Sequence, residues 1–253
     1  MAAEGAEHAG GSHSPMAQFE IKKIFDLHLG NYDVSFTNAS LLMVIALAVI
    51  SGFMIYAMRG RSLVPTRIQS IAEMLYEFIA NMVRENLGKD GMTYFPWVFS
   101  IFIFILVLNL LGMIPGSFTV TSHIIVTFAL AGMVWLTATL IGFAKHGVGY
   151  LKLFVPHGVP LLLMPVIVPI ELISYFIRPI SHSVRLFANM MAGHTMLKVF
   201  AGFAVMLPVW GKIAPVGFMV AFTGLEVVVA ILQAFIFTVL TCIYLNDAVN
   251  MHH

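Results

Sequence analysis

The sequence predicts an all-α polytopic membrane protein with five membrane-crossing helices and one amphipathic surface helix. Hydrophobic residues occupy 60% of the 253 positions and charged residues only 10%, a composition far from that of a soluble globular domain. Long uncharged stretches alternate with short polar ones, and each stretch is long enough to cross a bilayer. The last two stretches are much longer than a bilayer is thick, which predicts a long, strongly tilted helical hairpin.

Charge and cysteine content exclude several classes of function. The formal net charge is +1, so nothing suggests a nucleic-acid partner. Cys242 is the one cysteine of the chain, which excludes an intrachain disulfide and a thiolate metal cluster. We expect no metal site and no cofactor.

The chain is predicted to have two parts, an N-terminal tail with an interfacial segment over 1–38 and a single membrane domain over 39–253. The tail is polar and lacks the basic flank and apolar centre of a signal peptide. The first predicted span, 39–58, contains no charge. Arg59, Arg61 and Arg67 follow it, and basic residues beside a span mark the cytoplasmic side, so the N-terminus is expected outside.

An amphipathic helix is predicted over 66–88. Thr66 and Gln69 have the spacing of a capping box at its start, and Gly88 is a typical helix end. Its apolar residues recur at helical spacing opposite a charged face, which is unsuited to crossing a membrane. Two arrangements remain open: the helix lies on the cytoplasmic membrane surface or docks on a partner, or it folds onto the chain's own loops.

The next spans are predicted over 92–113 and 121–144, as an out-and-back pair joined by a short turn. Lys145 and His146 follow the second span and are expected on the cytoplasmic side. Asn109 lies inside the first of these spans. For this side chain, a hydrogen bond to a neighbouring helix is favoured over a role in ion conduction.

The final two spans are predicted over 161–207 and 213–245. They contain about 47 and 33 residues, or roughly 70 and 50 Å of helix, against a hydrocarbon core of about 30 Å. They cannot stand upright, and Pro165, Pro169 and Pro179 permit bends in the first of them. Five crossings place the C-terminus on the cytoplasmic side.

The first of these long segments carries a charge that a membrane should reject. A guanidinium at bilayer depth costs between about 3 and more than 10 kcal/mol, so Arg185 requires a functional reason to be there. At about 100° per residue, Arg185 shares one helical face with a series of polar residues. Its companions are Glu171, Ser174, Ser181 and Asn189.

Arg185 can act only as a fixed positive charge, because a guanidinium stays protonated. Glu171 lies 14 residues away, about 21 Å along the helix, which is too far for a direct salt bridge. The anion that meets Arg185 is therefore either Glu226 or a carboxylate of another protein. A cation that meets mobile carboxylates one at a time releases their protons and prevents a proton path from running straight through.

A second set of polar residues lies near one face of the last segment. Its members are Thr223, Glu226, Gln233 and Tyr244. The hairpin turn is expected to bring Glu226 close to His194, which points to the side of its helix opposite Arg185. An imidazole beside a buried carboxylate forms a proton donor and acceptor pair, and the alternative is a purely structural polar pair.

Several separated motifs resemble those of subunit a of the F-type ATP synthase. They are Glu171-Leu-Ile-Ser174, the run Ser181-His-Ser-Val-Arg185-Leu-Phe-Ala-Asn189-Met-Met-Ala-Gly193-His194, Glu226 with Leu232-Gln233-Ala-Phe-Ile-Phe, and Asn109-Leu-Leu-Gly-Met-Ile-Pro115. The motifs occur in the family's order, and the resemblance covers about residues 40 to 247.

The resemblance implies a membrane stator that faces a rotating ring of c subunits and performs no chemistry on ATP, so the chain is not itself an enzyme. Arg185 matches the essential arginine, which separates two offset half-channels. The residues that match the external half-channel are Asn189, His194, Glu226 and Gln233, and those that match the cytoplasmic one are Glu171, Ser174 and Ser181.

The resemblance also implies partners and a location. The partners are the c-subunit ring, the b and b′ subunits of the peripheral stalk, other ATP synthase subunits and membrane lipid. The transported ion is expected to be the proton, and the sequence leaves Na⁺ open as the alternative. His at 194 with Glu at 226 is similar to alphaproteobacterial and mitochondrial members, whereas many bacterial members have the two exchanged. The location is then a bacterial inner membrane, with the mitochondrial inner membrane as the alternative.

Two other functions are considered. A secondary transporter could use Arg185 to bind a small anion, although the chain has no matching halves of the kind that such transporters show. A haem-binding subunit could use His123, His182 or His194 as an axial ligand. Neither His182 nor Lys198 belongs to the motifs, and both are expected to be polar residues of a cavity or an interface.

Overall fold

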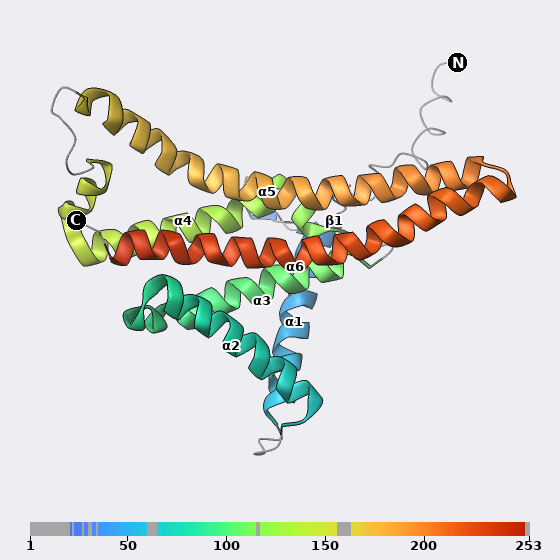
Figure 1. Ribbon diagram of the computed structural model, residues 1–253, viewed down its shortest axis with the longest axis horizontal. Helices are drawn as coiled ribbons and strands as arrows, with labels where there is room; N and C mark the ends of the chain where they lie inside the picture. The colour runs from blue at the N-terminus through green and yellow to red at the C-terminus, as the bar shows by residue number, and fades with distance from the viewer. Residues whose placement is uncertain are drawn as a thin grey trace.

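The computed structural model describes residues 21, 23–26, 28–29, 32–33, 35–59, 65–114, 117–155 and 163–250. Their architecture is helical, as predicted, and five helical segments among the described residues are long and apolar enough to cross a membrane (Figure 1). The α-helices are α1 (Asn38–Met58), α2 (Arg67–Leu87), α3 (Phe95–Gly112), α4 (Ile124–His146), α5 (Met164–Met206) and α6 (Ile213–Val249). Short 3-10 turns η2 (Lys89–Tyr94), η3 (Val120–Ser122), η4 (Gly147–Phe154) and η5 (Val209–Lys212) connect them.

Short β-strands precede the first helix, where the sequence predicted only an interfacial segment. β1 (Lys23–Phe25) pairs antiparallel with β4 (Phe36–Thr37), and β2 (His28–Leu29) pairs antiparallel with β3 (Tyr32–Asp33). Thr37 then caps α1, because its hydroxyl accepts a hydrogen bond from the Ser40 backbone amide. The predicted polar tail over residues 1–20 lies outside the described residues, as do Arg61 and Pro115.

The amphipathic helix α2 has the predicted caps. The Thr66 hydroxyl accepts a hydrogen bond from the Gln69 amide, and Gly88 ends the helix at a φ of 73°, where a residue without Cβ is favoured. The buried face of α2 packs on α3 and α6, with Tyr76 against Phe95 at 4.6 Å between ring centroids. Of the two arrangements that the sequence left open, packing on the chain's own loops is replaced by packing on its own membrane helices.

The apolar core lies between α2, α3, α4 and α6. Buried side chains such as Ile79 of α2, Ile105 of α3, Val134 of α4 and Phe237 of α6 belong to one cluster. Asn109 is fully buried in α3 and donates a hydrogen bond of 3.2 Å to the Ala230 carbonyl of α6. The expected bond between helices is therefore present.

The long hairpin of α5 and α6 dominates the shape of the molecule (Figure 1). The two helices contain 43 and 37 residues, roughly 65 and 55 Å, and they run side by side in opposite directions from η5. Pro169 and Pro179 lie inside α5, which is visibly bent. α6 continues to Val249, four residues beyond the predicted end, so Asp247 lies within the helix.

Candidate functional site

Arg185 lies at the middle of α5 with an exposed side chain, and it makes no hydrogen bond or ion pair with any described residue. Its surroundings on the outer side of α5 are apolar and exposed. They include Ile173, Ile177, Ile180 and Val184, each between 41% and 58% exposed. A guanidinium on such a surface requires a partner from another molecule, because the described part of the chain supplies no carboxylate to pair with it.

The other polar residues predicted on this side of α5 form a line rather than a cluster. Ser174 and Ser181 are exposed on the same outer side as Arg185, and Glu171 and Asn189 are half-buried. Glu171 and Arg185 are separated by about 21 Å of helix, so they do not meet. Asn189 faces α6, where it shares a cavity with Glu226.

His194 and Glu226 are brought together across the hairpin, as predicted. Nδ1 of His194 lies 3.5 Å from Oε1 of Glu226, and both side chains are buried. Gly193 makes this approach possible, because a Cβ at this position would lie 2.6 Å from Oε1 of Glu226. The sequence motif contained Gly193, but the sequence alone does not show that this position faces Glu226 of α6.

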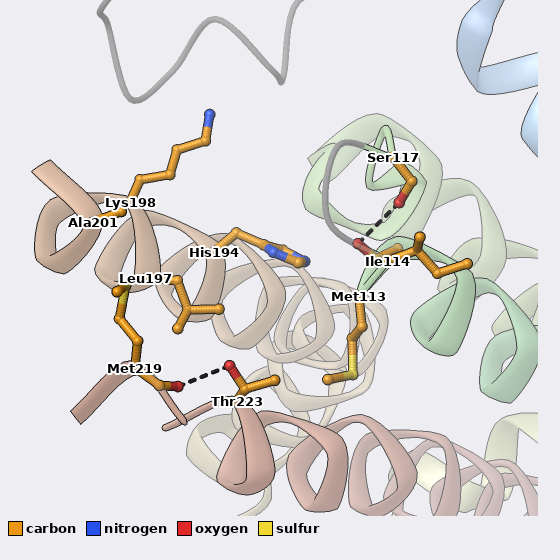
Figure 2. Close-up of a pocket in the computed structure, with 10 residues that line it drawn as sticks. Met113, Ile114, Ser117, His194, Leu197, Lys198, Ala201, Met219 and Thr223 are labelled. Carbon is orange, nitrogen blue, oxygen red and sulfur yellow. Dashed lines mark hydrogen bonds between the residues drawn. The ribbon is translucent and has the colours of Figure 1, made fainter. Parts of the chain in front are cut away.

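An outer cavity of about 340 Å³ reaches His194 (Figure 2). The end of α3, the residues that follow it, α5 and α6 form its walls, and Lys198 and Thr223 are among the lining residues. Figure 2 shows the imidazole of His194 pointing toward Met113 and Ile114, whereas the Lys198 amine extends away. This cavity gives His194 a route to one surface of the molecule.

A second cavity of about 170 Å³ touches Glu226. It is lined by Asn189 and Gly193 from α5 and by apolar residues of both helices. The outer cavity is lined by His194 and the second by Glu226, so the His194–Glu226 pair lies between two spaces. Asn189, which lines this second space, is one helical turn from Arg185 along α5.

Gln233 is buried two turns beyond Glu226 on α6 and makes no hydrogen bond with a described residue. The side-chain amide of Asn109 donates a hydrogen bond to the carbonyl of Ala230, which lies between Glu226 and Gln233 in the sequence. The three polar side chains Asn109, Glu226 and Gln233 therefore follow one side of α6 in the interior.

An ion pair that the sequence analysis did not predict joins α5 to the end of α6. Nη1 of Arg178 lies 2.8 Å from Oδ2 of Asp247, and each side chain is 33% exposed. The last predicted span ends at residue 245, so Asp247 was not expected on the helix that packs against Arg178. One signal in the sequence could have indicated this ion pair. Arg178 and Arg185 are seven residues apart, which puts both on nearly one side of α5, so Arg178 also needs a carboxylate partner.

The two residues outside the motifs have different positions. Lys198 lines the outer cavity, in line with its expected place at a cavity or interface. His182 is only 2% exposed, and its ring centroid lies 3.7 Å from that of Phe237 in α6. Neither nitrogen of His182 has a hydrogen-bond partner among the described residues.

Comparison with known proteins identifies the family. The model of the family described as ATP synthase A chain matches residues 40–246. The chain belongs to the ATP synthase subunit a family. It is 55% identical to ATP synthase subunit a of Rhodospirillum rubrum over 95% of this chain and 100% of that protein. The subunit of Parvibaculum lavamentivorans is 54% identical over 99% of this chain and 100% of its own length. That of Sinorhizobium medicae is 58% identical over 94% and 98%, respectively.

Membership in the ATP synthase subunit a family explains the composition of the chain. Its membrane-spanning helices and its bacterial relatives support a bacterial inner-membrane protein with other ATP synthase subunits as partners. Proton transport is consistent with this family. Membership favours that function over the small-anion transporter and the haem-binding subunit.

Proposed function

We propose that the chain is the proton-conducting stator subunit of a rotary F-type ATP synthase. In this proposal it forms two offset half-channels that serve the carboxylates of a c-ring, with Arg185 between them. The observation that carries the proposal is the His194–Glu226 pair, which lies between an outer cavity and a second cavity next to Asn189. One helical turn from Asn189, Arg185 faces outward from an apolar surface and forms no ion pair with a described residue.

The external half-channel begins at the outer cavity. A proton enters there, binds the imidazole of His194 and passes to the Glu226 carboxylate at 3.5 Å. An acid and a base in contact can exchange a proton without a large rearrangement. The proton then crosses the second cavity past Asn189 to a ring carboxylate, and Gln233 supplies a further polar group on this side of α6.

Arg185 keeps the two half-channels apart. Because its charge is permanent, it cannot relay a proton, but it attracts each ionised ring carboxylate that comes round. A ring carboxylate that has received its proton is neutral and can move into lipid. The exposed apolar residues around Arg185 are the surface that would face the ring.

The cytoplasmic half-channel follows the line of polar residues on the outer side of α5. A proton released near Arg185 leaves past Ser181, Ser174 and Glu171. With the N-terminus outside and the C-terminus inside, this line leads from the middle of α5 toward the cytoplasmic surface. Each proton that crosses supplies about 2.3 kcal/mol per 100 mV of membrane potential.

The remaining proposals concern the complex. The peripheral-stalk b and b′ subunits would hold this chain still while the ring turns. The chain contributes no step to ATP chemistry, which belongs to other subunits. Its part is to couple proton movement to rotation.

The test is replacement of Arg185 in the complete ATP synthase. Arg185→Ala should abolish ATP-driven proton pumping by inverted membrane vesicles and growth by oxidative phosphorylation, because nothing then separates the half-channels. The complex should still assemble, since Arg185 has no partner among the described residues. Arg84→Ala, at an exposed arginine of α2, is the matched control and should pump normally. Growth of the Arg185→Ala strain by oxidative phosphorylation would contradict the proposal.

A further inference from the structure

We propose that the Arg178–Asp247 ion pair reserves Arg185 for the ring carboxylates. In this inference, which rests on the proposed function, Arg178 occupies the carboxylate of α6 that would otherwise attract Arg185. Asp247 in turn cancels the charge of Arg178, which would otherwise compete with Arg185 for the ring. We refer to Arg178 and Asp247 as the charge clamp, and both are positioning residues.

The charge clamp is held in place from several elements. The guanidinium of Arg178 lies 5.8 Å from the ring centroid of Tyr175 and 5.5 Å from that of Tyr244, so it is packed between two aromatic rings. The Tyr175 hydroxyl is 3.1 Å from the Tyr150 hydroxyl of η4 and also bonds Thr139 of α4. A surface ion pair with mobile side chains would lack these contacts.

The clamp lies close enough to Arg185 to influence it. Arg178 and Arg185 are seven residues apart, which places them about 10 Å from each other on nearly the same side of α5. Tyr244 of α6 packs beside this stretch, with its ring centroid 5.5 Å from the guanidinium of Arg178. An arginine and an aspartate side chain together can span such a distance, so an unpaired Asp247 could draw Arg185 away from the ring.

The other carboxylates near the hairpin are not equivalent competitors. Glu226 contacts His194, on the side of α5 opposite Arg185. Glu171 lies a further two turns beyond Arg178, about 21 Å from Arg185. Within the described part of the hairpin, Asp247 is therefore the carboxylate whose state matters most for Arg185.

Neutralising one or both members of the clamp in the complete ATP synthase tests the inference. The variants are Arg178→Gln, Asp247→Asn and the double variant, each compared with Lys212→Gln, which removes a charge at the opposite end of the hairpin. ATP-driven proton pumping is measured in inverted vesicles, and the amount of assembled complex is measured on native gels.

The expected result is that each single variant lowers pumping about tenfold, since a competing charge-assisted hydrogen bond of about 1.5 kcal/mol made by the freed side chain corresponds to that factor. Arg178→Gln frees Asp247 to bind Arg185, and Asp247→Asn frees Arg178 to bind ring carboxylates at the wrong level. The double variant leaves neither charge and should return to within about twofold of the parent. Lys212→Gln should pump normally.

A clamp that only fastens α5 to α6 gives the opposite pattern. The double variant would then be at least as impaired as either single one, and that outcome overturns the inference, as would normal pumping by Asp247→Asn. Asp247→Asn changes the shape of the side chain little. If Arg178→Gln alone does not assemble, the comparison of Asp247→Asn with the double variant still distinguishes the inference from a clamp that only fastens α5 to α6. Failure of the proposed function is seen separately, as pumping by Arg185→Ala.

Discussion

At the residue scale, Gly193 shows how a single missing Cβ creates a functional contact. Gly193→Ala places a methyl group 2.6 Å from Oε1 of Glu226 and should push the carboxylate away from His194. We expect passive proton conductance through vesicles stripped of the catalytic sector to fall about tenfold, because the two groups no longer touch. The complex should still assemble, since the atom displaced is the end of a flexible side chain.

The matched control is Gly202→Ala on the same helix. A Cβ there meets nothing within 4 Å, so conductance should stay at the parental level. Parental conductance in Gly193→Ala would show that the approach of Glu226 to His194 is not required for proton uptake.

The His194–Glu226 pair also predicts the result of exchanging its members. Because the atoms lie 3.5 Å apart, the exchanged pair His194→Glu with Glu226→His keeps one acid and one base in contact. It should preserve more ATP-driven proton pumping than His194→Ala or Glu226→Ala alone. Equal losses in all three variants would mean that contact between the two groups has no part in proton transfer.

At the element scale, the packing of α5 on α6 buries the imidazole of His182, and no described residue forms a hydrogen bond with it. His182 stacks on Phe237, and its nitrogens have no hydrogen bond among the described residues. An unsatisfied buried polar group costs about 1–3 kcal/mol, so His182→Leu should raise the thermal stability of the purified complex. Pumping should remain. Loss of pumping in an assembled, more stable complex would instead place His182 on the proton route.

Local signals predicted the ends of elements well where a cap existed and poorly where none did. The caps of α2 at Thr66 and Gly88 were predicted, because both act through neighbouring residues. The end of α6 was misplaced, since no cap lies near residue 245 and the helix continues until Asn250. Because the predicted span ended at residue 245, Asp247 was not placed on the helix, and its ion pair with Arg178 was not predicted.

At the scale of the whole molecule, the outer side of α5 is the surface expected to meet a c-ring. Single cysteines at Ile180 and Val184, in a chain with Cys242→Ala, should crosslink to cysteines placed in the c subunit. Both positions are exposed, at 49% and 41%. Leu47→Cys is the control: it is 53% exposed on α1, on the other side of α6 from α5 in Figure 1.

The crosslinking result distinguishes two positions of the c-ring, against α5 or against another face of the chain. Crosslinks at Ile180 and Val184 with none at Leu47 support a ring against α5. The reverse result would place the ring elsewhere and leave Arg185 without its proposed partner. Blue native gels followed by antibody detection of the c subunit are sufficient to read the outcome.

The sequence by itself determined the class of the protein, the number of long apolar helices, the unusual length of the last two and the identity of the residues that bear charge. These follow from composition, length and spacing, which are properties of neighbouring residues. The tertiary structure alone decided which of the polar residues meet: His194 with Glu226 across Gly193, Arg178 with Asp247, and Arg185 with none of the described residues. Such pairings depend on the register and bend of two helices more than 50 Å long, and a small shift along either axis would change every contact between them.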